Sequence, residues 1–162
     1  MNLKRINTEN KSDTKKFINF PYTLYKDNKY WVPPFFSEMK AILNRNKHPF
    51  YKHSTAEFFI VEEGVDVLGR IAILKNNNFC KHHDKQVAFF YYFDCINDDN
   101  VSKKLFDAAA AWSKNNGVKE IYGPRGFTRS SGIGMLIEGH QYYPAIGIPY
   151  NFNYYGDLTE KY

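Results

Sequence analysis

The sequence is poor in cysteine and has no long apolar run. Cys80 and Cys95 are its only cysteines among 162 residues, too few for the disulfide framework of a small secreted domain. No apolar segment approaches the length that spans a bilayer, and residues 1–10 lack the apolar centre of a signal peptide. These absences predict a cytoplasmic protein with no membrane partner.

The chain also lacks internal repeats, low-complexity tracts and a recognisable linker. Residues 1–162 are therefore expected to form a single domain, long enough to bury a core. What is abundant is aromatic: 14 Phe and 13 Tyr, within an apolar content of 43% that excludes disorder. This composition predicts an unusually aromatic core or groove.

Charge is distributed unevenly. The net charge is +5, and residues 1–50 hold ten Lys and Arg against four Asp and Glu. In residues 51–162 the two signs nearly balance, twelve against thirteen. A local basic excess can attract nucleic acid, anionic lipid or a phosphorylated cofactor, or it can be an ordinary solvated surface.

Hydrophobic periodicity predicts alternating strands and helices. Strands are expected at residues 3–8, 56–62, 67–74, 86–93 and 118–122. A helix capped by Ser12 or Asp13 is expected to run to about residue 25. Further helices are expected at 35–44, at 99–116 and beginning in 151–162, with at most one helical turn at 134–138 and a polar loop at 75–85. Pro21 predicts a kink or an early stop in the first helix. The strand, helix and strand spanning residues 86–122 predict a parallel crossover.

The turn before the helix at 99–116 is acidic. A strand that leads into a helix N-terminus commonly holds a phosphate, because the free N–H groups and the helix dipole attract anions. This turn instead carries Asp94, Asp98 and Asp99 and has no glycine. Asp98 or Asp99 is expected to cap the helix.

Two further groups of residues are candidate sites. Cys80, His82, His83 and Cys95 do not have the close paired spacing of zinc ligands, so no metal site is predicted. Past the last predicted strand, a ligand or anion site is expected from Arg125, Arg129, Ser130 and Ser131. The alternative is an ordered surface loop whose arginines stack on the many tyrosines.

Several segments together resemble a little-characterised bacterial family related to the GCN5-related N-acetyltransferase (GNAT) superfamily. They are FINFPYTLYKDNKYWVPPF, HPFYKHSTAEFFIVEE, LGRIAILKN, FFYYFD, EIYGP and PYNFNYYGDLTEKY. The resemblance implies an α/β, mixed-sheet (α+β) GNAT-like acyl-CoA N-acyltransferase fold. Its order is one strand, two helices, three strands, a helix, a strand and a helix.

The resemblance also implies a cofactor site. Acetyl-CoA or another acyl-CoA would lie in a V-shaped split between the fourth and fifth strands, with its pyrophosphate at the helix N-terminus near residue 99. The residues implied to bind it are Phe93, Asp94, Cys95, Ile96, Asn97 and Asn100. The superfamily's loop is Gln/Arg-x-x-Gly-x-Gly/Ala, whereas residues 95–100 here contain no glycine.

Catalytic roles follow from the same comparison. Asp94 is expected as the general base, and Tyr154 or Tyr155 as the acid, since Thr159 stands where the superfamily often has a tyrosine. The superfamily's sixth and seventh strands have no counterpart here, which predicts an incomplete domain that a C-terminal domain or a second chain completes.

Three functions remain open at this point. The first is a GNAT-like N-acyltransferase-related protein that moves an acyl group from acyl-CoA to an amine, with the small-molecule acceptor unknown. The second is a non-catalytic small-molecule or peptide-binding module on the same fold. The third, a nucleic-acid-binding domain, rests on the basic N-terminal third and the aromatic content.

Overall fold

The computed structural model describes residues 1–128 and 131–162. Its sheet has five strands in the order β1-β2-β3-β4-β5. The strands are β1 (Asn2–Arg5), β2 (Thr55–Glu63), β3 (Asp66–Lys75), β4 (Val87–Cys95) and β5 (Glu120–Tyr122). The helices are α1 (Lys11–Leu24), α2 (Phe36–Leu43), α3 (Asn77–His83), α4 (Asp99–Asn115), α5 (Tyr155–Thr159) and the 3-10 turn η1 (Pro49–Lys52).

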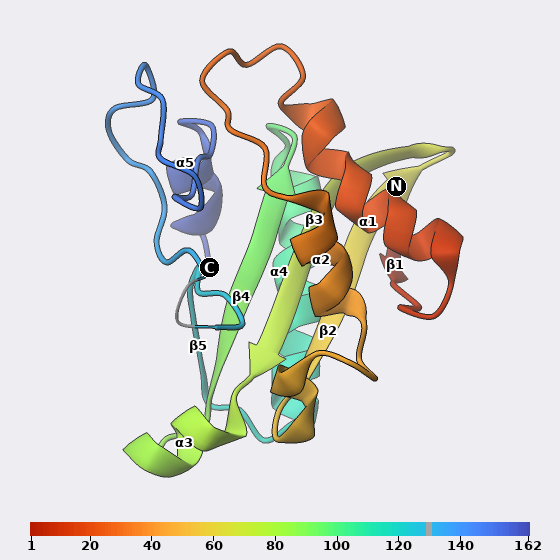
Figure 1. The fold of residues 1–162 in the computed structure, drawn as a ribbon, viewed down its shortest axis with the longest axis vertical. Coiled ribbons are helices and arrows are strands. Elements are labelled where there is room, and N and C mark those ends of the chain that lie inside the picture. The colour runs from red at the N-terminus through yellow and green to blue at the C-terminus, as the bar shows by residue number, and fades with distance from the viewer. Residues whose placement is uncertain (129–130) are drawn as a thin grey trace.

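Strands β1 to β4 are antiparallel, and β5 joins β4 in parallel through α4. Helices α1 and α2 cover one face of the sheet and α4 the other, while the segment containing α5 lies beside β4 (Figure 1). The mixed α/β fold, the order of its strands and the parallel crossover are therefore confirmed, with one helix, α3, added between β3 and β4.

Alternating side chains on β2, β3 and β4 divide into two cores. Phe58, Ile60 and Ala72 pack under α1 and α2 and form the α1-side core. Val61, Ile71 and Ile73 pack under α4 and form the α4-side core. Both faces of the central strands are thus buried, which explains why they read as nearly continuous apolar runs.

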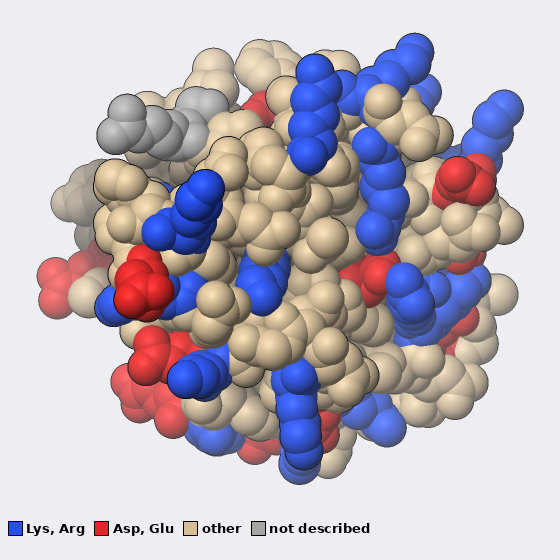
Figure 2. Space-filling model, turned by 90° about the horizontal axis from the view of Figure 1, so that it is seen from below, with Lys and Arg blue, Asp and Glu red and all other residues tan. Residues whose placement is uncertain are grey.

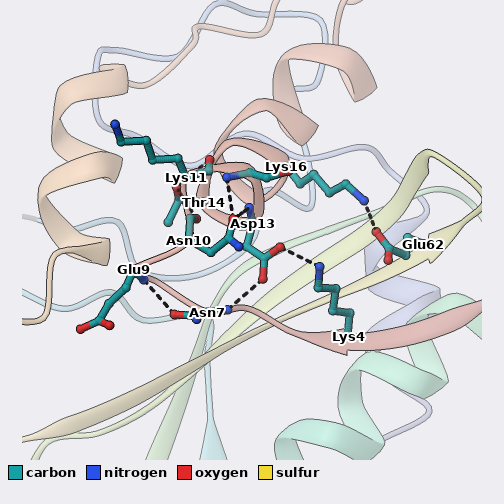
Figure 3. Close-up of polar contacts among 10 residues, drawn as sticks. Lys4, Asn7, Glu9, Asn10, Lys11, Asp13, Thr14, Lys16 and Glu62 are labelled. Atoms are coloured by element: carbon teal, nitrogen blue, oxygen red, sulfur yellow. Dashed lines mark hydrogen bonds and ion pairs between the residues drawn. The ribbon is translucent and has the colours of Figure 1, made fainter.

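Helix α1 begins differently from the prediction. Neither Ser12 nor Asp13 caps it; the Asn10 side chain accepts hydrogen bonds from both of their backbone N–H groups. The Asp13 carboxylate instead accepts hydrogen bonds from the Lys4 ammonium at 2.6 Å and from the Asn7 N–H (Figure 3). The Lys4 hydrogen bond holds the pKa of Asp13 below its usual range. Asp13 therefore ties the first turn of α1 to β1.

Helix α1 also continues through Pro21 to Leu24 rather than stopping there. Proline has no N–H to donate to the carbonyl four residues earlier, which here belongs to Phe17. The Arg70 guanidinium on β3 donates to that carbonyl at 2.8 Å. A side chain from the sheet thus satisfies the backbone group that proline leaves free.

Other local predictions differ in detail. The expected polar loop at 75–85 contains α3, because the Asn76 side chain caps it and Cys80 packs into the α1-side core. Residues 134–138 form no helical turn, and the last helix is limited to five residues. Asp98 caps α4 as one of the two expected residues, and Gly117 follows its end with φ +66°.

Candidate functional site

Strands β4 and β5 separate soon after they pair. Backbone pairing joins residues 87–89 to residues 120–122, and the Arg125 N–H then donates to the Phe90 carbonyl. Beyond that bond, β4 runs on to Cys95 while the chain after β5 leaves the sheet. An opening between neighbouring parallel strands is a common place for a ligand in α/β sheets.

A bulge in β4 lies at this opening. The register against β3 shifts between Arg70 and Ala72, so β4 has one extra residue there. Tyr92 takes a left-handed backbone conformation with φ +49°, which is strained for a residue with a large side chain. Tyr91 and Tyr92 consequently both pack on the α1-side core, and the strand redirects Asp94 to the same face as Arg70.

A pocket of about 170 Å³ opens on this face. Its walls come from α1, the segment before α2, β4 and the loop after β5. The lining residues used below are Trp31, Val32, Glu38, Arg70, Tyr91, Asp94, Met135, Ile148 and Tyr155. Most of the wall is apolar and aromatic, with a small polar floor, as in small-molecule sites generally.

The floor is a buried ion pair. Arg70 and Asp94 are only 3% and 9% exposed, and the Arg70 Nε donates to the Asp94 Oδ2 at 2.7 Å. The remaining Arg70 contacts are the Phe17 carbonyl, the Met39 sulfur and the rings of Phe17 and Tyr92. The guanidinium is therefore fully engaged by the protein.

Two tyrosines extend this floor. The Tyr25 hydroxyl lies 3.1 Å from the Asp94 Oδ1 and 2.9 Å from the Tyr155 hydroxyl. A hydroxyl has one proton to donate, and the carboxylate is the stronger acceptor, so Tyr25 donates to Asp94 and accepts from Tyr155. Burial, then the charge of Asp94, raises the pKa of both tyrosines well above the usual value.

A column of stacked rings fixes Tyr25 in place. Trp31 stacks on Tyr25 at 5.1 Å, Tyr25 on Phe152 at 4.8 Å, and Phe152 on Tyr154 at 5.3 Å. These rings come from α1, the segment before α2 and the last twelve residues. The aromatic richness of the sequence thus builds the wall beside the polar floor.

The predicted acids Tyr154 and Tyr155 both bind the end of β4. The Cys95 N–H donates to the Tyr155 hydroxyl at 2.9 Å, and the Tyr154 hydroxyl donates to the Cys95 carbonyl at 2.8 Å. Of the two, Tyr155 lines the pocket. Both stay predictions as proton donors, and Asp94 as the base, because no observation tests these roles.

The predicted pyrophosphate position does not fit a pyrophosphate. The Asp98 carboxylate already accepts the N–H groups of Asn100 and Val101, and the Ile96 N–H donates to the Leu68 carbonyl. Asp99 pairs with Lys161 at 2.6 Å. The helix N-terminus is closed by its own carboxylate, where a phosphate needs free N–H groups and no negative charge.

The other residues implied to bind the cofactor are dispersed. Phe93 is buried in the α4-side core, whereas Asn97 is exposed beyond the end of β4. Both hydrogen-bonding groups of the Cys95 backbone are used by tyrosines. Of this set, only Phe93 and Asp94 line the pocket.

The predicted anion site is split. The Arg125 guanidinium lies 4.8 Å from the ring centroids of Phe79 and Phe89, so it stacks on aromatic rings as the alternative interpretation expected, with Phe in place of Tyr. The Ser131 hydroxyl accepts a hydrogen bond from the Thr128 N–H at 3.1 Å. Arg129 and Ser130 lie outside the described residues.

Three further observations concern the cysteines, the charged side chains and the lengths of the helices. Cys80 lies in the α1-side core and Cys95 in the α4-side core, so the sheet separates the two thiols. On the face that contains α3 and η1, Lys and Arg are interspersed with Asp and Glu rather than gathered in one patch (Figure 2). Among residues 1–128 and 131–162, no helix is both long and apolar enough to cross a bilayer.

The residues that the sequence reasoning did not single out are Tyr25, Trp31, Glu38 and Arg70. A signal was present for Arg70, an arginine inside the apolar strand LGRIA, since a buried charge requires a partner. No comparable local signal marks Tyr25, Trp31 or Glu38, because their positions depend on how α1 and α2 pack.

Comparison with curated proteins gives two relatives. The chain is 33% identical over 152 residues to "Protein YghO" of Escherichia coli (strain K12), and 24% identical over 151 residues to "Bacterial ceramide synthase" of Caulobacter vibrioides. The matches cover 94% and 93% of this chain but only 39% of each relative. No protein-family model matches the sequence.

Solved structures give the fold. A tandem GNAT protein from the clavulanic acid biosynthesis pathway superposes with a TM-score of 0.60 at 10% identity, over 76% of this chain and 36% of that one. An aminoglycoside acetyltransferase from an uncultured soil metagenomic sample, in complex with sisomicin, gives 0.52 at 15% identity, over 76% and 77%. These matches confirm the resemblance inferred from the sequence: the chain has the fold of the GCN5-related N-acetyltransferases.

Proposed function

We propose that this chain transfers an acyl group from a thioester to an amine held in the pocket between β4 and β5. The observation that carries the proposal is the Asp94 carboxylate at the floor of a mostly apolar and aromatic pocket, at the point where the two strands separate. The GNAT fold supports it. So does the name of one relative, a ceramide synthase, since ceramide formation joins an acyl group to an amine.

In this proposal the amine nitrogen attacks the acyl carbon, a C–N bond forms and the C–S bond breaks. Asp94 receives the proton that leaves the nitrogen, and Tyr155 gives a proton to the departing sulfur. The Tyr25 hydroxyl, hydrogen-bonded to both, then returns a proton from Asp94 to Tyr155, so both groups regain their starting forms. Arg70 and Tyr25 position the carboxylate, the first by the ion pair and the second by its hydroxyl. The closed N-terminus of α4 takes no part, so the nucleotide of an acyl-CoA is not held there.

A second candidate is a binding module that holds an amine without reacting it. The capped α4 N-terminus and the occupied Cys95 backbone favour this alternative, since both remove donors that a phosphate-bearing cofactor would use. We also keep as a proposal that a further domain or a second chain pairs with β5, whose residues are exposed at the edge of the sheet.

The test is amide formation. The protein is incubated with short and long acyl-CoAs, acyl-pantetheines and a panel of amines, and products are identified by mass spectrometry. Asp94→Asn alone leaves Arg70 unpaired, so the matched variant is Arg70→Met with Asp94→Asn, which removes both charges. Amide formed by the wild type and lost from this folded double variant supports the enzyme; ligand binding with no amide from any donor supports the binding module.

A further inference from the structure

The pocket contains a second carboxylate, and this one is free. Glu38 lies in the first turn of α2 and lines the pocket. Its side chain makes no ion pair with any Lys, Arg or His of residues 1–128 and 131–162.

The charges in the pocket therefore do not cancel. Arg70 neutralises Asp94 and has its nitrogens engaged by Asp94, Phe17 and Met39. Glu38, an exposed residue, adds a negative charge that no further cation among the described lining residues offsets. Glu38, Tyr91 and Tyr92 line the same pocket, and burial first, with the charge of Glu38 among the smaller causes, raises the pKa of both tyrosines.

The rest of the lining selects against a strongly polar ligand. Trp31 presents an aromatic ring, and Val32, Met135 and Ile148 supply apolar surface. Outside the pocket the loop after β5 carries further exposed apolar side chains, which together are called the apolar strip. Its members are Ile133, Ile137, Tyr142, Tyr143 and Ile146, each at least 64% exposed.

We propose that Glu38 binds the ammonium group of an amine whose remaining body is apolar and packs on Trp31 and the loop after β5. A carboxylate beside aromatic rings at the edge of an apolar pocket is a suitable environment for an organic cation. This assignment rests on the proposed function, because it names the acceptor class for the same site. It predicts that hydroxyl-rich amines, which cannot pack on the strip, bind poorly.

The experiment is calorimetric titration with n-octylamine, 1-octanol and octanoate, without any acyl donor. Three proteins are compared: the wild type, Glu38→Gln, and Glu138→Gln. Glu138 is an exposed glutamate of the same loop that lies outside the pocket lining, so it controls for a general loss of negative charge. Thermal unfolding of each variant checks that the fold is intact.

We expect octylamine to bind the wild type and Glu138→Gln alike, and Glu38→Gln at least about tenfold more weakly. Octanol and octanoate should bind the wild type at least about tenfold more weakly than octylamine. The proposal is overturned if octylamine does not bind, if octanol binds as tightly, or if Glu38→Gln binds within twofold of the wild type. Octylamine binding without acylation would support the role of Glu38 and refute the proposed acyl transfer. Acylation of octylamine at the same rate by the wild type and Glu38→Gln would support acyl transfer and refute the role of Glu38.

Discussion

Replacing Arg70 by methionine tests the floor of the pocket in depth. The change keeps an apolar stem of similar length and removes the guanidinium that pairs with Asp94 and donates to the Phe17 carbonyl. Breaking a buried ion pair by removing one partner costs about 3–5 kcal/mol, because the other charge stays buried without compensation. For a chain of this size the melting temperature should fall by about 6–20 °C.

Differential scanning calorimetry measures the loss, and two comparisons identify its cause. Lys103→Met removes one partner of the exposed Lys103–Asp107 pair and should change the melting temperature little. Arg70→Met with Asp94→Asn leaves no unpaired charge, so it should recover more than half of the loss. If Arg70→Met melts within 3 °C of the wild type, or if the double variant is less stable than the single one, the reasoning about the ion pair is wrong.

Three other predictions concern Pro21, Asp98 and Cys95. Pro21→Ala should stabilise Arg70→Met by about 1 kcal/mol more than it stabilises the wild type, because the restored N–H can donate to the Phe17 carbonyl that Arg70 no longer binds. Equal effects of Pro21→Ala in the two backgrounds of a double-mutant cycle would refute this. Asp98→Ala should lower the free energy of unfolding in urea by about 0.5–2 kcal/mol because the helix cap is lost, whereas Asp98→Asn should cost far less. In calorimetry, Asp98→Asn should bind coenzyme A no more tightly than the wild type; tighter binding would show a phosphate site at the N-terminus of α4. Burial, with the charges of Asp98 and Asp94, raises the pKa of Cys95 to about 12, so the folded protein keeps a proton that the unfolded chain releases above pH 9. The resulting stability is present below pH 9 and is lost as pH rises toward 12, by up to about 1.4 kcal/mol per pH unit. Cys95→Ala should remove this part of the pH dependence of the free energy of unfolding, measured by urea unfolding at several pH values.

Much of the fold was predictable because it depends on local periodicity. The helix over α4 has apolar residues at helical spacing, a capping aspartate and a terminal glycine, and each of these acts within one element. The parallel crossover followed from the short return to β5. The predicted cap of α1 is wrong because Asn10, Ser12 and Asp13 can all cap a helix. Lys4 on β1 binds the Asp13 carboxylate, and Asn10 caps the helix.

The site was less predictable because its parts are far apart in the chain. Asp94 was singled out, but its partners Tyr25 and Arg70 lie 69 and 24 residues away. Tyr155 was expected near the chemistry, yet its link to Tyr25 spans 130 residues. Such contacts arise from the packing of α1 and of the last residues around β4, which no local pattern records.

The central claim is that the carboxylate at the floor of the β4–β5 pocket supports acylation of an amine. The most direct measurement is the rate of amide formation from an acyl thioester and n-octylamine, followed by mass spectrometry, for the wild type and for the folded Arg70→Met/Asp94→Asn variant. The account predicts turnover by the wild type and at least about a hundredfold slower turnover by the variant, as expected for loss of a general base. Equal rates in the two proteins would contradict it, as would the absence of amide with every thioester and amine in the panel.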